Sequence, residues 1–436
     1  MLLRSDLATL RAPLLRTNWR EPTVGRCALI AAVVGGLLLA VVVGAPPMVE
    51  LLAYDAASTP PLFRIAADGP FDAGLQHGRL ARSRIAGWFA TAEMRKVFAF
   101  AASPNGSAAL ANLKADNTTH KNNTGSVTTH KNNTREFPAF AEELRGIAAG
   151  SGFDVDKIWC ANLLNELGSL MGHQGFQAAP QHCSDVYAIE AGGYSRGFVH
   201  GHNDDWSSAV KPFWYFAAFT YADSVAAGGF RACAGVNYPA ALVGWAPTWN
   251  GFGIYSTQNS MVPRKSRAGG LACAFVQRRA ICSSSTLDEA VRALTVPGWS
   301  EGASMNVVDV RGKRMANVEL WEDESSVLEV TEDVMNYTHF NQYKHLTTRK
   351  GRAVDSPAAF ANDPRQARAD GLPPPRTAED VKAILSDAKI YRPEATITTM
   401  VLNGSARRLE VWCATRSAGS QPLYSWDLDT FFSAGD

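Results

Sequence analysis

Cys183 begins a stretch of sequence in which a thiol and a carboxylate are expected to come together. Residues 184–190 and 197–202 each have the composition of a strand, and the turn AGGYSR separates them. An antiparallel pairing centred near Tyr194 places Asp205 beside Cys183. A thiol is a strong nucleophile once a base removes its proton. Taken alone the pairing is weak, because most buried cysteines are inert packing and an aspartate after asparagine is usually a turn residue.

The sequence around these residues resembles a known family. The runs QHCSDVY at Cys183, GFVHGHNDDW ending at Trp206 and WNGFGIYSTQN ending at Asn259 carry the likeness. They are similar to the acyl-CoA:6-aminopenicillanic-acid acyltransferase-like family, the C45 peptidase group of N-terminal-nucleophile hydrolases. The resemblance extends over residues 63–436, with further matching runs that include FAEELRGIAAGSGFDVDKI, STLDEAVRAL and ASMNVVDVRGKRMANVEL.

The resemblance implies a self-processing enzyme with a cysteine nucleophile. The chain would cut itself between His182 and Cys183 and expose the α-amino group of Cys183, which serves as the base for its own thiol. Asp205 would orient the α-ammonium group, and Asn259 would donate a hydrogen bond to the oxyanion. The expected reaction cleaves a non-peptide or small-peptide amide, or transfers its acyl group, through an acyl-enzyme on Cys183. No metal and no organic cofactor is expected.

The sequence departs from the family pattern at several positions. His182 stands where relatives often carry glycine, which would affect the self-cleavage. His202 stands where the ceramidase and bile-salt hydrolase branches carry arginine, so it is a weak candidate for the site. The run NYTHF at 336–340 corresponds to a later family segment, in which Thr338 and His339 are also weak candidates.

Two other functions remain open at this point. The first keeps the fold and hydrolyses a lipid N-acyl amide, as ceramidase-like relatives do. The second is a glycosylated surface protein of the same fold that has lost its activity. A net charge of +1 excludes neither, but it gives no reason to expect a nucleic-acid partner.

The elements that position these residues form an α+β pattern. Helices are expected at 78–100, at 136–170 with a break at 150–152, and at 286–295. Further strands are expected at 213–221, 251–258, 303–310, 314–321, 396–402 and 408–413. The helical α-chain region therefore spans 63–182 and the catalytic β-chain 183–436. The family resemblance implies a four-layer αββα sandwich with two facing antiparallel sheets.

The N-terminus predicts a single membrane anchor. Residues 27–45 are apolar and uncharged, and their length is close to what crosses a bilayer. Five arginines against two acidic residues precede them, so 1–26 is expected to be a cytosolic tail. Residues 46–62 form a tether, and the body lies in the secretory or endolysosomal lumen or outside the cell, as in a single-pass type II protein. A cleaved signal peptide is the alternative, although its apolar region is usually about 7–15 residues long.

Glycosylation signals agree with this location. Each of the following residues begins an Asn-x-Ser/Thr sequon: Asn105, Asn117, Asn122, Asn132, Asn336 and Asn403. Several fall in 103–134, where TTHKNNT occurs twice, so we expect a low-complexity, glycosylated insertion without packed structure. The Asn336 sequon overlaps the weak site segment, and a glycan there would crowd it.

Cysteine usage leaves the disulfide pattern open. One of the seven cysteines lies in the apolar span, and the other six could form three disulfides in an oxidising compartment. If Cys183 stays free for catalysis, at least one more is unpaired. The spacing shows no CxxC or Cys/His pattern, so we expect no zinc site.

Overall fold

The computed structural model describes residues 29–34, 37–42, 59–114, 119–121, 127–129, 133–171, 183–222, 229, 231–261, 269–346, 363–413 and 417–433. Its chain divides into two compact units, Met1–Tyr54 and Asp55–Asp436. In the first unit, β1 (Leu29–Val34) and β2 (Leu37–Val42) pair as an antiparallel hairpin, within the range predicted as a membrane anchor. Among the described residues, no helix combines the length and the apolar character that crossing a membrane requires. The anchor therefore stays a prediction.

The second unit is built on two β-sheets. The larger sheet has the order β14-β13-β12-β11-β10-β9-β8-β3, in which β3 runs parallel to β8 and the other pairs are antiparallel. Its strands are β3 (Leu62–Ala67), β8 (Tyr215–Tyr221), β9 (Ala232–Asn237), β10 (Thr248–Asn250), β11 (Ile254–Met261), β12 (Gly302–Asp309), β13 (Arg314–Trp321) and β14 (Glu324–Glu329). The smaller sheet is antiparallel, with the order β15-β6-β7-β16-β17-β18. Its strands are β15 (Asn336–His339), β6 (Ser184–Ile189), β7 (Phe198–Asp205), β16 (Thr396–Asn403), β17 (Arg408–Cys413) and β18 (Tyr424–Asp427).

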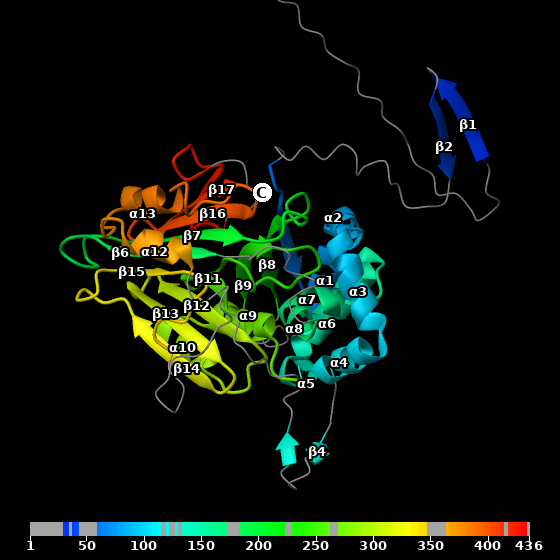
Figure 1. Cartoon of the computed structure of the whole chain (residues 1–436), viewed down its shortest axis with the longest axis horizontal. Coiled ribbons are helices and arrows are strands. Elements are labelled where there is room, and N and C mark those ends of the chain that lie inside the picture. The colour runs from blue at the N-terminus through cyan, green and yellow to red at the C-terminus, as the bar shows by residue number, and fades with distance from the viewer. Residues whose placement is uncertain are drawn as a thin grey trace, which may run out of the picture. The chain divides into compact units, whose positions relative to one another are not determined.

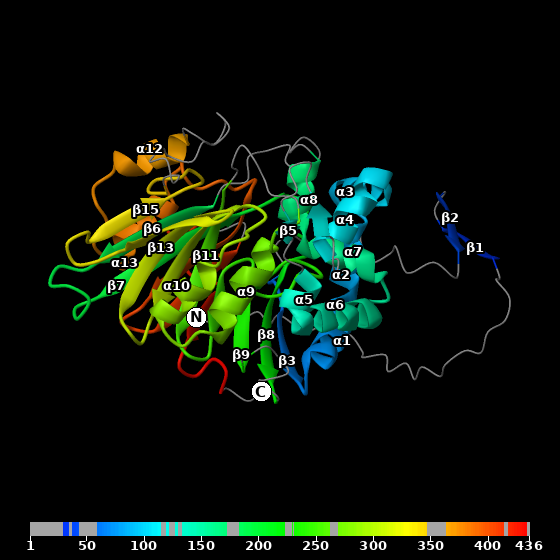
Figure 2. The same ribbon diagram turned by 90° about the horizontal axis from the view of Figure 1, so that it is seen from below.

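Helices pack on both sheets (Figure 1). Helices α9 (Cys273–Ser283) and α10 (Leu287–Leu294) lie against the larger sheet, whereas α12 (Pro364–Asp370) and α13 (Ala378–Leu385) lie against the smaller one. The two sheets face each other: the Tyr187 hydroxyl of β6 donates to Asn306 Oδ1 of β12 over 2.7 Å. Figure 2 shows the same arrangement from below. The fold is thus α+β with two stacked sheets, as the sequence predicts.

Strand β6 shows how these layers bury a strand completely. Tyr187 points to the larger sheet, while Val186 belongs to a cluster with Val381 and Leu385 of α13 on the other side. All six residues of β6 are buried. A strand that is covered on both faces need not alternate apolar and polar residues along its sequence. Polar residues placed on such a strand must find partners inside the protein.

A helical region precedes the smaller sheet in sequence and lies beside the β3 and β8 end of the larger one (Figures 1 and 2). Its helices are α1 (Pro70–Leu80), α2 (Arg82–Phe89), α3 (Ala92–Ala102), α4 (Pro104–Lys114), α5 (Asn133–Glu136), α6 (Pro138–Ser151), α7 (Val155–Asn162) and α8 (Leu164–Leu170). The predicted break at 150–152 is confirmed, since α6 ends at Gly152 with φ 78°. Asp154 caps α7 by accepting a hydrogen bond from Asp156 N.

Two predictions for this region are wrong in part. The sequence predicts no packed structure in 103–134, yet α4 forms there and buries Leu110 and Leu113. Its alanines and leucines favour a helix, and they supply the apolar side that packs. Short strands β4 (Thr119–Lys121) and β5 (Val127–Thr129) follow as a hairpin. The range 63–182 is also not purely helical, because β3 joins the larger sheet.

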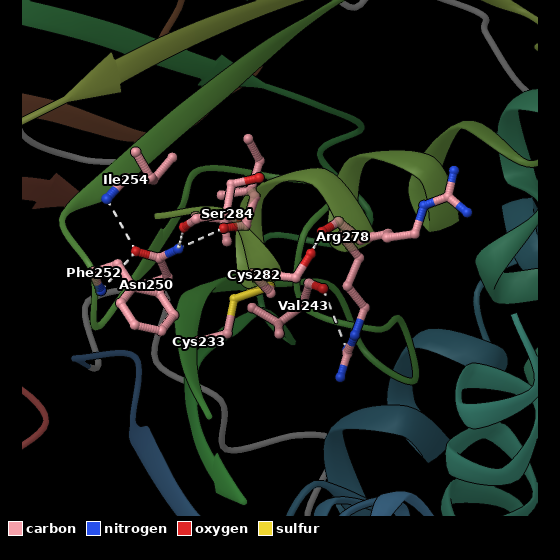
Figure 3. Close-up of a disulfide and its surroundings, with 12 residues drawn as sticks. Cys233, Val243, Asn250, Phe252, Ile254, Arg278, Cys282 and Ser284 are labelled. Carbon is pink, nitrogen blue, oxygen red and sulfur yellow. Dashed lines mark hydrogen bonds between the residues drawn. A yellow bond between two sulfur atoms is a disulfide. The ribbon is translucent and has the colours of Figure 1, made fainter. Parts of the chain in front are cut away.

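One disulfide ties the larger sheet to the helix packed on it (Figure 3). Cys233 of β9 is bonded to Cys282 of α9, 49 residues further on. Nearby, Asn250 Nδ2 donates to the carbonyls of Ile281 and Ser284, each over 2.7 Å. Among the described cysteines, Cys160, Cys183 and Cys273 form no disulfide. The thiol at 183 is therefore available for chemistry.

Candidate functional site

Cys183 lies directly before β6, and its side chain is enclosed between the sheets. The residue is 7 % exposed. Its Sγ donates weakly to Asp204 Oδ1 at 3.8 Å and to the Asp205 carbonyl at 3.9 Å. Burial raises the pKa of the Cys183 thiol well above its ordinary value, and the carboxylates of Asp204 and Asp205 raise it further. In the intact chain the thiol is therefore protonated at neutral pH.

The hairpin register differs by one residue from the predicted one. Ser184 pairs with Asn203 and Asp185 with His202, so the continuing register puts Asp204 opposite Cys183. The loop closes with Glu190 N donating to Gly197 O, which centres the turn between residues 193 and 194. A slip of one residue moves a side chain to the other face. Asp204 therefore faces the thiol, whereas the prediction gave that place to Asp205.

Asp205 lies on the other face of β7, close to the start of β6. Its Oδ1 accepts a hydrogen bond from Thr396 Oγ1 at 2.6 Å, and its Oδ2 accepts one from Arg365 Nη1 at 3.3 Å. The same Arg365 nitrogen donates to Ser184 Oγ at 3.2 Å. Burial raises the pKa of Asp205 to about 7, against the opposing charge of Arg365. One guanidinium nitrogen of Arg365 thus links the Asp205 carboxylate to the side chain of Ser184, the residue after Cys183.

Arg365 is a site residue that the sequence analysis missed. It lies in the first turn of α12, behind the capping residue Asp363, whose Oδ2 accepts from Arg365 Nη2 at 2.6 Å. Nη2 also donates to Asn341 Oδ1 at 3.0 Å. The Asp363-Pro364 pair is a sequence pattern typical of a helix start, and it indicates that a helix begins here. Nothing in that signal indicates that the arginine reaches a strand 160 residues away.

His202 and Asp185 form a buried pair on the face that Cys183 occupies. His202 Nδ1 lies 2.9 Å from Asp185 Oδ1, and His200 Nε2 lies 3.0 Å from the same oxygen. Burial alone would lower the pKa of His202, but the Asp185 carboxylate outweighs it and raises that pKa. The two histidines hold the pKa of Asp185 below its usual range despite burial. The sequence marked His202 as a weak candidate, and the structure brings it to the thiol.

Asp204 is held by a tyrosine from the larger sheet's side. The Tyr238 hydroxyl lies 2.9 Å and 3.0 Å from the two carboxylate oxygens of Asp204. Burial raises the pKa of Asp204, and His202 and Tyr238 oppose the rise. The sequence analysis assigned neither residue. If the prediction had centred the turn half a residue earlier, Asp204 would have been paired with Cys183.

Asn259 lies near the end of β11, with its side chain buried between the sheets. Its Nδ2 donates to the His339 carbonyl over a long 3.4 Å, and its Oδ1 accepts from Asn306 Nδ2 at 2.9 Å. His339 is the register partner of Asp185, two residues beyond Cys183. Asn259 therefore lies near the edge of the smaller sheet where β15 pairs with β6. Its side-chain N–H makes only a weak hydrogen bond there.

The two candidates in the NYTHF segment do not join the cluster around the thiol. Thr338 faces α12, where its hydroxyl accepts from Gln366 Nε2 at 2.9 Å. His339 points to the larger sheet, and its Nε2 lies 2.9 Å from Glu319 Oε1. Neighbouring side chains on a strand point to opposite faces, which explains why the two separate.

The remaining predicted positions are on the surface or outside the described residues. His182 lies outside the described residues, as do Asn117, Asn122 and Asn132. Asn105 is exposed on α4, which suits a glycosylation site. Asn403 is half-buried at the end of β16, and its Oδ1 accepts from Ala406 N at 2.9 Å.

The α+β fold with two stacked sheets is that of a family of amidohydrolases and acyltransferases. The chain belongs to the acyl-coenzyme A:6-aminopenicillanic acid acyl-transferase family, which matches residues 194–411, half of its length. The family resemblance drawn from the sequence is thereby confirmed. The matched range contains Asp205, Asn259 and Arg365, whereas Cys183 precedes it.

Solved structures offer weaker similarities. The N-acylethanolamine-hydrolyzing acid amidase ortholog of Caenorhabditis elegans is 14% identical, covers 56% of this chain and 99% of its own, and has a TM-score of 0.37. Penicillin V acylase from Agrobacterium tumefaciens is 13% identical, covers 54% of this chain and 84% of its own, with a TM-score of 0.35. A mutant of the conjugated bile acid hydrolase from Clostridium perfringens is 10% identical, covers 56% and 94%, and has a TM-score of 0.31. No protein of curated function matches the chain significantly.

Proposed function

We propose that this protein is a self-processing hydrolase that cleaves small N-acyl amides through an acyl-enzyme on Cys183. Membership of the family supports the reaction class. The single observation that carries the proposal is the free, buried thiol of Cys183 directly before β6, with the Asp204 carboxylate facing it. Transfer of the acyl group to an amine instead of water would use the same intermediate.

The base in this mechanism is the α-amine of Cys183, released by cleavage after His182. In the intact chain that nitrogen is an amide and cannot accept a proton. A free α-amino group has a pKa of about 7.7–8.0, so it can take the thiol proton near neutral pH. Asp205 would bind the resulting ammonium group, and its bond to Arg365, which also bonds Ser184, supports this role. Self-cleavage would thus convert a protonated thiol into an activated one.

The acyl transfer then proceeds with all atoms accounted for. The Cys183 sulfur attacks the amide carbonyl, its proton passes to the α-amine, and the leaving amine takes that proton as the C–N bond breaks. Water adds to the thioester, which releases the acid and returns the proton to sulfur. Asn259 stabilises the oxyanion through its side-chain N–H, and a donor of this type contributes about 10²–10³ in rate. Its long bond to the His339 carbonyl is one that an oxyanion can replace.

Processing would leave two chains that stay together. Strand β3, before the cut, pairs with β8, after it. Glu143 of α6 forms a buried ion pair with Arg278 of α9 at 2.6 Å. Burial of both charged groups makes this pair costly to separate. We therefore propose that the α and β chains remain one enzyme.

The location proposed is the secretory or endolysosomal lumen or the cell exterior, behind the predicted anchor at 27–45. The disulfide between Cys233 and Cys282 supports an oxidising compartment. The exposed Asn105 sequon is compatible with a glycosylated surface. A membrane tether would bring the enzyme close to membrane-derived amides.

Replacement of the nucleophile tests the proposal. Cys183→Ala should abolish hydrolysis of every substrate in a panel of N-acyl amino acids and N-acyl lipid amides. The matched control is Cys160→Ala, because Cys160 is also a buried thiol without a disulfide but lies in α7. That variant should keep turnover within a few-fold. Amide release by folded Cys183→Ala protein would refute the assignment of the nucleophile.

A further inference from the structure

Three side chains able to bind a metal ion meet between the two sheets. Cys183 Sγ, a ring nitrogen of His202 and a carboxylate oxygen of Asp204 lie within 4.8 Å of one another. All three residues are buried. His202 and Asp204 are two apart on β7, so they share a face, and the register brings Cys183 opposite Asp204. A thiolate, an imidazole and a carboxylate are all ligands that zinc accepts in proteins.

His202 gives an independent sign of a missing ligand. Its Nε2 is buried and finds no hydrogen-bond partner among the described residues. A buried nitrogen left unpaired is unfavourable, so a partner is expected at this atom. Its other nitrogen, Nδ1, lies 2.9 Å from Asp185 Oδ1. Histidines that bind metals are oriented in this way, by a carboxylate on the nitrogen that does not touch the ion.

The charges around this cluster favour a cation. The Asp204 carboxylate lies beside the thiol, with its Oδ1 3.8 Å from Cys183 Sγ. Arg365 compensates Asp205, and His202 compensates Asp185. Asp204 accepts hydrogen bonds only from uncharged groups among the described residues, the Tyr238 hydroxyl and the Cys183 thiol. A divalent ion would supply the positive charge that the Cys183 and Asp204 groups lack.

We propose that Cys183, His202 and Asp204 bind one zinc ion, which occupies the nucleophile and reversibly stops turnover. The inhibition, but not the binding, rests on the proposed function. Ligand atoms of a tetrahedral zinc site are about 3.4–3.6 Å apart, so the three side chains draw together by about 1 Å on binding. The thiol releases its proton to solvent, and so does Nε2 of His202 when the ring is charged, because both atoms need a free lone pair to bind the ion; no electron is transferred. The fourth position takes water or, after self-cleavage, the α-amine of Cys183.

Local sequence patterns do not mark this site, because zinc motifs are recognised by short spacings. Here the ligands are separated by a complete hairpin, and the pairing register brings them together. Magnesium and calcium prefer oxygen ligands, so they should bind poorly to a set containing sulfur and imidazole.

Metal content of the full-length protein tests the proposal. Metal-free protein is mixed with one equivalent of zinc sulfate and separated from free metal by gel filtration, and bound zinc is measured by mass spectrometry. Wild type should retain one zinc per chain, and His202→Gln and Asp204→Asn should each weaken binding at least tenfold. His339→Gln, which alters a buried histidine paired with Glu319, should bind as wild type does. Magnesium chloride should give no retained metal.

A second measurement covers the case in which a variant does not fold. In wild type, zinc should slow alkylation of Cys183 by iodoacetamide at least tenfold and leave that of Cys160 unchanged, as read by peptide mass spectrometry. Equal zinc retention by wild type and folded His202→Gln, or alkylation of Cys183 unaffected by zinc, would overturn the site. Protein that binds zinc through these residues yet hydrolyses no amide would keep the site and reject the proposed function.

Discussion

Asp205 and Arg365 are the residues whose charges the proposed mechanism depends on. Asp205 can hold the α-ammonium group only when it is ionised, and burial raises its pKa to about 7 against the effect of Arg365. Activity should therefore fall as the pH drops below that value. Arg365→Gln removes the opposing charge and raises the Asp205 pKa further. The acid limb of the kcat/KM profile should move to higher pH by about 1–3 units.

Arg368→Gln is the matched control for this profile. Arg368 lies one turn further along α12, where its Nη2 bonds to Asp387 Oδ2 at 2.6 Å. Its loss should leave the acid limb where it is in wild type. If Arg365→Gln shows an unshifted limb with normal folding, Asp205 does not control the reaction in the way proposed.

The sequence predicted candidates for some of the residues that the structure brings together. Cys183, Asp205 and Asn259 were predicted from motif resemblance, and the structure places all three on or beside strands of the facing sheets. The facing partner of the thiol, Asp204, was not predicted, because a shift of one residue in the turn changes which face a side chain takes. Arg365 was not predicted because its contacts are long-range, and spacing in the chain carries no information on them.

At the scale of elements, α1 and α6 pack through glycines spaced four residues apart. An added Cβ at Gly146 would lie 2.1 Å from the Phe71 carbonyl oxygen, and one at Gly74 would lie 2.0 Å from the Glu143 carbonyl oxygen. Those contacts are with backbone, which cannot move aside alone. The glycines at 78 and 150 make similar approaches. The crossing therefore requires a residue without a side chain.

Gly146→Ala should destabilise the protein, although alanine favours a helix over glycine by about 1 kcal/mol. Overpacking of this kind typically costs about 1–3 kcal/mol. The measurement is the free energy of unfolding by denaturant. Gly371→Ala is the control, since an added Cβ there meets nothing closer than 3.5 Å. Equal stability of the two variants would disprove the close approach of α1 and α6.

Elements with strong local patterns were predicted well. The strands expected at 314–321 and 408–413 have the observed bounds, and Thr286 caps the helix predicted at 286–295, as its hydroxyl accepts from Glu289 N. Strand β3 was missed because its partner, β8, lies far along the chain and its short run has no turn signal. The edge strands β14 and β18 were not predicted either. Their residues are only partly buried, so their sequences lack a clear apolar pattern.

At the scale of the whole molecule, the proposed cleavage divides the body into two interlocked chains. Contacts between them include the strand pair β3 and β8, and Asn162 of α7, which bonds the backbone at Ala240 and Leu242. Asn133 likewise donates to the Gly270 carbonyl at 3.2 Å. Because each part supplies buried surface and hydrogen bonds to the other, neither should leave after the cut.

The stacked sheets explain why the candidate site lies so far inside the protein. Their facing surfaces hold polar side chains in pairs, such as Tyr187 with Asn306, and β6 itself is buried on both faces. Sequence patterns predicted the α+β class but not which strands face each other. That information depends on long-range packing, and the family resemblance implied only that two antiparallel sheets face each other.

Self-cleavage before Cys183 can be read from the N-terminal sequence of the chain that carries the C-terminus. Full-length protein with a C-terminal tag is purified, separated on a denaturing gel and sequenced from its amino end. We expect the tagged chain to begin at Cys183 and Cys183→Ala protein to stay whole. An active wild-type enzyme that remains a single uncut chain, or a tagged chain that begins at another residue, would contradict the proposed self-cleavage.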